Sequence, residues 1–238
     1  MQPAHLSRER AQGREYDEGL RKYLSSIYLK MMTGVLLTGV VAQLVGSSPY
    51  LLELFLGGPQ RFAVIFAPVA ILWFGFNPLT MRSSQLMMAF YAISAAYGIS
   101  FSAIAAVAAH DATFAIIVAK AFFIAASMFA GLSIYGYTTK TDFAPMRSLL
   151  VMGIWGVFIA SILNIFFASG MMDYVISLAS IVLFSGMTVW QTQDMKRMYY
   201  AVSGQEMGER LAWGAAYTLY VSFIALFMNL LNLMSNQR

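Results

Sequence analysis

The chain has 238 residues, of which 59% are hydrophobic and only 11% are charged, with a net charge of +4. A soluble domain has roughly 25% charged residues, and this chain has too few of them to cover the surface of a soluble fold of its length. The composition therefore excludes an ordinary soluble enzyme, a disordered regulator and a nucleic-acid binder, and it is typical of an integral membrane protein.

The chain begins with a polar segment, residues 1–24, that is rich in charges and has no apolar core. A cleavable signal peptide has an apolar stretch of roughly 7–15 residues directly after its basic start. We therefore expect residues 1–24 to be a polar N-terminal tail on the cytoplasmic side, and residues 25–238 to form the transmembrane domain. The first span then acts as an uncleaved anchor.

Seven charge-poor windows follow, and each has about the 20 apolar residues that a membrane-spanning helix needs. They are Met31–Leu52, Phe62–Met81, Ser83–Ala109, Ala112–Thr139, Ser148–Met172, Tyr174–Gln193 and Leu211–Gln237. Each window is continuously apolar, which favours helices over the alternating strands of a membrane barrel. Pro68 and Asn77-Pro78 predict a kink or an early stop in the second window. We expect an all-α integral membrane protein with seven transmembrane helices.

The basic residues between the windows indicate the orientation. With the N-terminus inside, nearly all Lys and Arg residues fall in cytoplasmic segments, as the positive-inside rule requires. These residues are Arg8, Arg10, Arg14, Arg21, Lys22, Lys30, Arg82, Lys140, Arg147, Lys196, Arg197 and Arg210. The other side has only Arg61 and Arg238. In a bacterium this orientation predicts an inner-membrane protein with a cytoplasmic N-terminus and a periplasmic C-terminus.

One ionisable residue, Lys120, lies within a window. At about 1.5 Å per residue it lies roughly 12 Å inside the outer end of its helix. Two interpretations stay open, because such a lysine can extend its side chain to the interface or make a structural hydrogen bond, or it can belong to a conduction path. All carboxylates lie outside the central parts of the windows, which argues against a strong intramembrane cation site.

Several chemistries lack the residues that they need. The last window has no lysine for a retinal Schiff base, and the two histidines, His5 and His110, lie at edges where they cannot ligate a membrane haem. With no cysteine there is no thiolate metal site, and no motif of a phosphate-binding loop or zinc protease is present. We therefore expect no enzyme, no cofactor and no bound metal.

Polar side chains recur along the last window at helical spacing. They are Thr218, Ser222, Asn229 and Asn232. A helix with polar groups at several levels faces protein rather than lipid. The stripe is either interhelical hydrogen bonding that holds the bundle together or a polar path through it.

Four segments carry a resemblance to a known family. The most specific string, SIYGYTTK, lies within Phe122–Asp142, and Met152–Phe167, Trp190–Tyr200 and Gly214–Leu231 follow. Together they resemble the Bax inhibitor-1 (transmembrane Bax inhibitor motif) family, and Arg14–Leu24 is similar to its bacterial branch. The resemblance implies a last helix in the middle of six others.

The resemblance also implies a functional site. Members are associated with a pH-sensitive cation leak, chiefly of Ca²⁺, with protection against cell death in eukaryotes and, in some bacteria, with binding to a membrane-bound AAA protease. The leak is attributed to two aspartates and an arginine latch. Here the aspartate positions are Gln191 and Ser222, and Arg82 matches the latch arginine. Asp194, about one turn beyond Gln191, is a candidate surrogate, but we expect a neutral hydrogen-bonded plug of Gln191, Ser222 and Arg82.

Two functions from different classes follow. The first is a non-conducting regulator or accessory subunit that binds another membrane protein, for example a membrane AAA protease. The alternative is a cation leak channel for Ca²⁺ or H⁺ in ion homeostasis, with altered or absent pH gating, since Gln and Ser cannot titrate as a carboxylate pair does. In both cases the chain lies in the lipid bilayer and has no nucleic-acid partner.

Overall fold

The computed structural model describes the backbone of residues 4–202 and 206–236, and the side chains of residues 18–201 and 206–236. Every regular element in these ranges is a helix. The elements in chain order are α1 (Ala4–Gly46), α2 (Pro49–Leu56), α3 (Gln60–Gly75), α4 (Ser83–His110), α5 (Ala112–Thr138), the short 3₁₀ helix η1 (Ala144–Met146), α6 (Arg147–Phe167), α7 (Gly170–Val202) and α8 (Glu206–Ser235).

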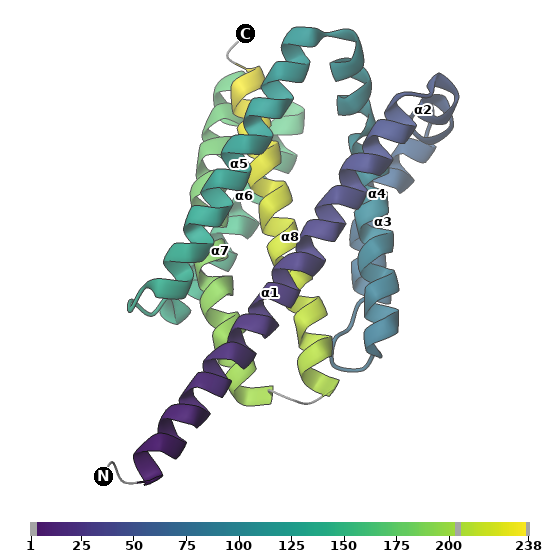
Figure 1. Cartoon of the computed structure of the whole chain (residues 1–238). Coiled ribbons are helices and arrows are strands. Elements are labelled where there is room, and N and C mark those ends of the chain that lie inside the picture. The colour runs from purple at the N-terminus through teal and green to yellow at the C-terminus, as the bar shows by residue number, and fades with distance from the viewer. Residues whose placement is uncertain (1–3, 203–205, 237–238) are drawn as a thin grey trace.

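The helices run up and down in one bundle, and the two ends of the chain lie at opposite ends of it (Figure 1). Six helices are long and apolar enough to cross a membrane: α1, α4, α5, α6, α7 and α8. The pair α2 and α3 passes the same test only when the two helices count as one span, with a bend of 76° between them. The prediction of an all-α membrane protein is confirmed, and six or seven possible spans agree approximately with the predicted seven.

The first two spans differ from their expected bounds. The first was expected to end at Leu52, but α1 ends at Gly46, and a separate helix α2 begins at Pro49. Proline has no N–H group to continue a helix and fits its first turn, and the Ser48 side chain accepts a hydrogen bond from the Leu51 N–H group. The expected early stop in the second span is confirmed, because α3 ends at Gly75, just before Asn77-Pro78.

The structure shows no break at the expected boundary between the tail and the transmembrane domain, which was placed between residues 24 and 25. Helix α1 continues through residue 24 without a break. Leu20 and Leu24, on the tail side of this boundary, are both buried in the hydrophobic core. The packed part of α1 therefore begins before residue 25, and the cytoplasmic position of the residues before it stays a prediction.

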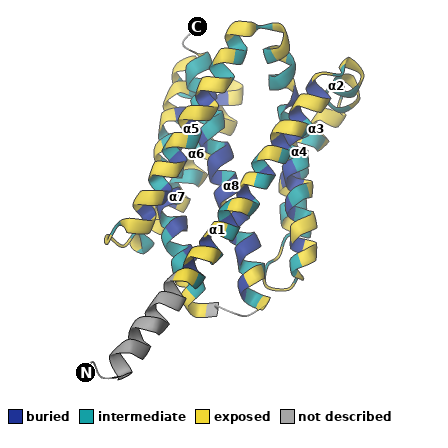
Figure 2. Cartoon of the chain, in the orientation of Figure 1, coloured by how far each residue is buried: buried dark blue, intermediate teal, exposed yellow. Residues whose placement is uncertain are grey.

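Helix α8 is the centre of the bundle. In its apolar window 56% of the residues are buried, compared with 11–33% in the other five long helices. It packs against α1, α4, α5 and α7, and Figure 2 shows its dark blue residues between the more exposed outer helices. The expectation of a central last helix is confirmed. Helix α6 is the most peripheral of the long helices, with 11% of its window buried.

Close packing of α1 on α4 depends on glycine. A Cβ atom on Gly98 would lie 2.7 Å from Val41 Cβ and 2.8 Å from the Thr38 carbonyl oxygen. Gly131, on the neighbouring helix α5, has no such neighbour within 4 Å. Small residues let membrane helices approach each other closely, and van der Waals contact then stabilises the pair.

This difference gives a stability test. We expect Gly98→Ala to lower the free energy of unfolding by about 1–3 kcal/mol, because the added methyl group would overpack a filled interface. Gly131→Ala is the matched control and should leave stability unchanged or slightly raised. Unfolding in detergent, followed by circular dichroism, measures both, and equal stability of the two variants would contradict the packing described for α4.

Candidate functional site

Gln191 and Ser222, the two positions at which the resemblance implies aspartates, lie together at the centre of the bundle. Ser222 Oγ, on α8, donates a hydrogen bond of 3.0 Å to Gln191 Oε1 on α7. Both side chains are buried, with 1% and 8% of their surfaces exposed. The pair is neutral, so it joins the two helices without placing a charge in the low-dielectric interior.

Two threonines flank Gln191 on α7. Thr188 and Thr192 each donate a hydrogen bond to the carbonyl oxygen four residues earlier, at 2.8 and 2.9 Å. Such back-bonding satisfies a hydroxyl group within its own helix. The Thr192 hydroxyl also lies 3.2 Å from the Tyr28 hydroxyl of α1. Because Thr192 already donates its single hydrogen, the Tyr28 hydroxyl is the donor in this second bond.

A second buried polar contact holds α8 to α1. The Tyr220 hydroxyl lies 2.7 Å from Thr38 Oγ1, and Tyr220 is fully buried. The single hydroxyl hydrogen of Thr38 can bond the carbonyl oxygen of Gly34 or that of Ser94 on α4. Tyr220 is therefore the donor to Thr38, and this contact joins α1, α4 and α8.

The polar stripe on α8 divides into different environments. Asn232 Nδ2 donates to Ser177 Oγ on α7 at 3.1 Å, and Ser222 reaches the same helix. Asn229 donates to the Ala225 carbonyl oxygen of its own helix, and Thr218 is exposed and bonds the Ala215 carbonyl oxygen. These contacts fit the interpretation of the stripe as interhelical hydrogen bonding, except at Thr218 and Asn229.

Arg82 is not part of the expected plug. Within the side chains that the structure describes, its guanidinium group has no hydrogen bond or ion pair to Gln191 or Ser222. Arg82 is exposed at the start of α4, where its backbone N–H group donates to Gln85 Oε1 at 3.0 Å. Its charge acts on Glu206 at the start of α8. The hydrogen bond between Ser222 and Gln191 forms without it.

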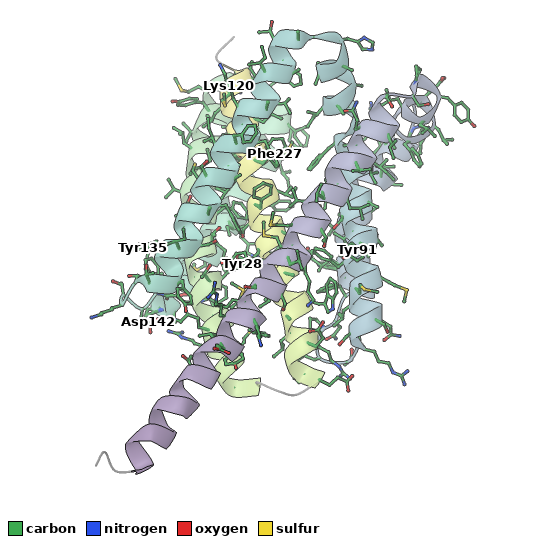
Figure 3. The ribbon with its side chains drawn as sticks, in the orientation of Figure 1. Tyr28, Tyr91, Lys120, Tyr135, Asp142 and Phe227 are labelled. Atoms are coloured by element: carbon green, nitrogen blue, oxygen red, sulfur yellow. The ribbon has the colours of Figure 1, made fainter. Side chains whose placement is uncertain are left out.

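Among the described side chains, neither of the remaining two ionisable candidates makes a hydrogen bond or ion pair with Gln191 or Ser222. Asp194 is half-buried near the last turns of α7, where the charges of Arg147 and Arg197 act on it. Lys120 is exposed on α5 near the end of the bundle where the C-terminus lies (Figure 3). It shares a helix face with Ile116 and Phe123, which are 54% and 69% exposed. This face points toward lipid, which is the position that an extended lysine side chain requires.

The loop between α5 and α6 is clamped onto α7. Gln193 Nε2 donates to the Thr141 carbonyl oxygen at 2.7 Å, and Gln193 Oε1 accepts from the Phe143 N–H group at 3.0 Å. The Lys196 ammonium group donates to the Tyr137 carbonyl oxygen at 3.0 Å. The Ala144 N–H group and the Arg197 guanidinium both bond Asp142 and hold the pKa of this carboxyl below its usual value. The sequence SIYGYTTK, which carried the resemblance, ends at this loop, where Figure 3 labels Asp142.

The described part of the chain offers no set of ligands for a metal. In residues 18–201 and 206–236 no three side chains of His, Asp or Glu converge on one point. The site therefore consists of neutral hydroxyl and amide groups around α8, with charges at the ends of the bundle.

Comparison with known proteins assigns the chain to a family. A family sequence model described as "Inhibitor of apoptosis-promoting Bax1" matches residues 20–238. The chain belongs to the Bax inhibitor-1 family. It is 35% identical to an uncharacterized protein of Rickettsia prowazekii, over 96% of this chain and 95% of that protein. It is 32% identical to an uncharacterized membrane protein of Streptococcus pyogenes serotype M1, over 91% of this chain and 93% of that protein.

In this member of the Bax inhibitor-1 family, part of the buried polar core could be predicted from the sequence and part could not. Gln191 and Ser222 were found because they stand at positions where the family resemblance implies aspartates. Thr38, Tyr220, Tyr28 and Thr192 were missed, since a single hydroxyl group in an apolar window gives no sign of its distant partner.

The hydrogen bond between Ser222 and Gln191 can be measured by a double-mutant cycle. We expect Ser222→Ala to be destabilising, because it leaves the buried Gln191 carbonyl oxygen without its donor. The coupling energy with Gln191→Leu should be about 0.6–1.7 kcal/mol, the range known for hydrogen bonds between membrane helices. Unfolding in detergent gives the four free energies, and a coupling energy of zero would show that the bond does not hold α7 to α8.

Proposed function

We propose that this membrane protein is a non-conducting regulator or accessory subunit that binds another membrane protein. The observation that carries the proposal is the buried hydrogen bond from Ser222 to Gln191 at the positions of the family's aspartates. A cation crossing the bilayer needs oxygen ligands, and carboxylates in particular, to replace its water. A serine hydroxyl group that donates its hydrogen to an amide oxygen supplies no negative charge to hold a cation.

The other contacts of α8 support the same proposal. The central helix is joined by neutral bonds to α1 through Tyr220 and to α7 through Asn232. Such bonds do not change with pH in the physiological range, because hydroxyl and amide groups do not titrate there. The alternative function is a cation leak in ion homeostasis, and the family fold is the observation that favours it.

A liposome experiment separates these two functions. The purified chain is placed in liposomes that contain a Ca²⁺-sensitive dye, and dye fluorescence is followed after Ca²⁺ is added outside at several pH values. We expect wild type to match empty liposomes at every pH. The double variant Gln191→Asp, Ser222→Asp should leak Ca²⁺ and do so in a pH-dependent way, because two close carboxylates share a proton.

The matched control is Gln191→Asn, Ser222→Asn. Asparagine has nearly the shape of aspartate but no charge, so this variant should stay silent if charge is what opens the path. A monodisperse elution profile shows that each variant is folded. A robust Ca²⁺ leak through the wild-type protein would overturn the proposal of a non-conducting regulator.

We also propose that the chain lies in the bacterial inner membrane with its N-terminus in the cytoplasm. The support is the placement of the basic residues along an up-and-down bundle. The loop containing Lys140, the end of α7 with Lys196 and Arg197, and the start of α4 with Arg82 all belong to the end of the bundle that the N-terminal half of α1 reaches (Figure 1). Positive charge of this kind collects on the cytoplasmic side of membrane proteins.

Cysteine labelling tests the orientation, because the natural chain contains no cysteine. We expect Thr141→Cys to be protected in intact spheroplasts from a membrane-impermeant maleimide and to react in inside-out vesicles. Glu53→Cys, in exposed α2 at the other end of the bundle, should show the opposite pattern. Labelling of Thr141→Cys from outside would mean that the orientation is reversed.

A further inference from the structure

An apolar groove runs along the bundle between α1 and α5, with α8 as its floor. It consists of three cavities of about 400, 390 and 330 Å³. The first two share Val35, Phe122 and Phe223, and the last two share Tyr28 and Ser133, so the three form one continuous groove. Phe227 and Tyr28, which belong to its two ends, are labelled in Figure 3.

The groove opens to the lipid side of the bundle. Met32 and Leu36 on its α1 wall are 59% and 66% exposed, and Phe122 on its α5 wall is 38% exposed. The α1 residues that line two of these cavities extend from Leu24 to Leu36. At about 1.5 Å per residue this is roughly 18 Å, slightly more than half of a hydrocarbon core of about 30 Å. The depth matches the acyl chains of one leaflet.

Polarity changes in order along this half of the groove. Its middle is lined by apolar side chains, among them Val35 and Phe129. Nearer the N-terminal side, Ser133 lines both cavities, and its Oγ atom is buried without a hydrogen-bond partner among the described groups. Ser133 is 8% exposed. A buried hydroxyl group without a partner is costly, and a ligand acceptor in the groove would remove that cost.

Positive charge lies beyond Ser133. Tyr137 lines the end of the groove, and the Lys196 ammonium group lies 4.6 Å from the centre of its ring. On the other wall, Arg21 is exposed and stands three residues before Leu24, so it shares the groove-facing side of α1. Asp142, the neighbouring carboxylate, is already paired with Arg197.

We propose that this half of the groove binds an anionic phospholipid of the cytoplasmic leaflet. Its acyl chain lies between Met32 and Phe129, an ester oxygen accepts the hydrogen of Ser133, and the phosphate lies between Lys196 and Arg21. Along this half of the groove, an apolar wall, an unpartnered hydroxyl group and two basic side chains follow one another. A phospholipid has its acyl chain, ester and phosphate in the same order. This binding does not depend on whether the chain conducts ions.

The alternative occupants are a transmembrane helix of another protein and a second copy of this chain. Either occupant would bury the apolar walls. Neither has, as a general feature, an anionic group at the level of Lys196 and Arg21. An anionic headgroup does, and clusters of Lys and Arg at the cytoplasmic face recognise such headgroups. Charge complementarity therefore favours the phospholipid.

Native mass spectrometry of the full chain tests the proposal. The protein is purified in mild detergent, stripped of lipid, and titrated with phosphatidylglycerol or phosphatidylcholine of the same acyl composition. We expect a single tight adduct that prefers phosphatidylglycerol. Ala130→Phe, which fills the groove from α5, should weaken this adduct by about tenfold or more. Met32→Trp fills it from α1, at an exposed position, and should act in the same way if Ala130→Phe fails to fold.

Two matched controls make the result specific. Ser127→Phe adds the same ring to an exposed position of α5 that does not line the groove and should leave the adduct unchanged. Arg21→Gln with Lys196→Gln should reduce the preference for phosphatidylglycerol by roughly twenty-five-fold, since each basic residue near an anionic headgroup contributes about fivefold. Lys22→Gln with Arg82→Gln removes the same charge elsewhere and should not reduce it.

The proposal is overturned if the groove-filling variants bind phosphatidylglycerol as tightly as wild type. It is also overturned if the adduct has no preference between the two headgroups, which would indicate an unspecific acyl contact. A stoichiometric protein or dimer that occupies the groove and excludes the lipid, detected in the same spectra, would assign the groove to one of the other occupants.

Discussion

The structure depends on one constraint: in the hydrocarbon core a polar group without a hydrogen-bond partner is costly, because no water is present there to bond it. Helix α8 has the most buried window of the bundle and carries Ser222, Tyr220 and Asn232. Each of these side chains bonds a different residue on α7 or α1. These bonds hold α8 to α1 and α7, and apolar packing joins it to α5. In line with this constraint, Lys30 within α1 pairs with Glu209 of α8 at 3.1 Å, whereas Lys120 is exposed on α5.

The buried pair and the groove are neighbours through α7 and α1. Thr192 follows Gln191 directly in the sequence, bonds Tyr28, and lines the same end of the groove as Ser133. Lys196, one turn further along α7, belongs both to the clamp on the loop between α5 and α6 and to the basic end of the groove. A phosphate near Lys196 would therefore act on the helix that also holds Ser222. This arrangement gives a physical route by which lipid composition could affect the packing of α8.

Much of the fold could be predicted from the sequence, because it depends on properties that each segment carries by itself. Apolar windows predicted the spans, and Asn77-Pro78 predicted the early end of α3. The break at Ser48-Pro49 was missed, since the apolar window continues through it. Arg82 could not be placed, because whether it reaches α7 depends on how the loop before α4 folds. The pairs of Thr38 with Tyr220 and of Gln193 with the loop join residues that are far apart in sequence, and no local pattern predicts them.

Where the family resemblance implies two aspartates, Gln191 and Ser222 would change the energetics of the centre more than its shape. Two carboxylates in a low-dielectric site are stable only if they share a proton or pair with a cation, so their state follows pH. A serine that donates to a glutamine needs no proton or cation from outside, and its bond is made at every pH at which the protein is folded. The same backbone can therefore hold a pH-sensitive centre or a permanent contact between α7 and α8. In this chain Ser222 and Gln191 form a neutral contact between α7 and α8, and the proposal of a non-conducting protein rests on this contact.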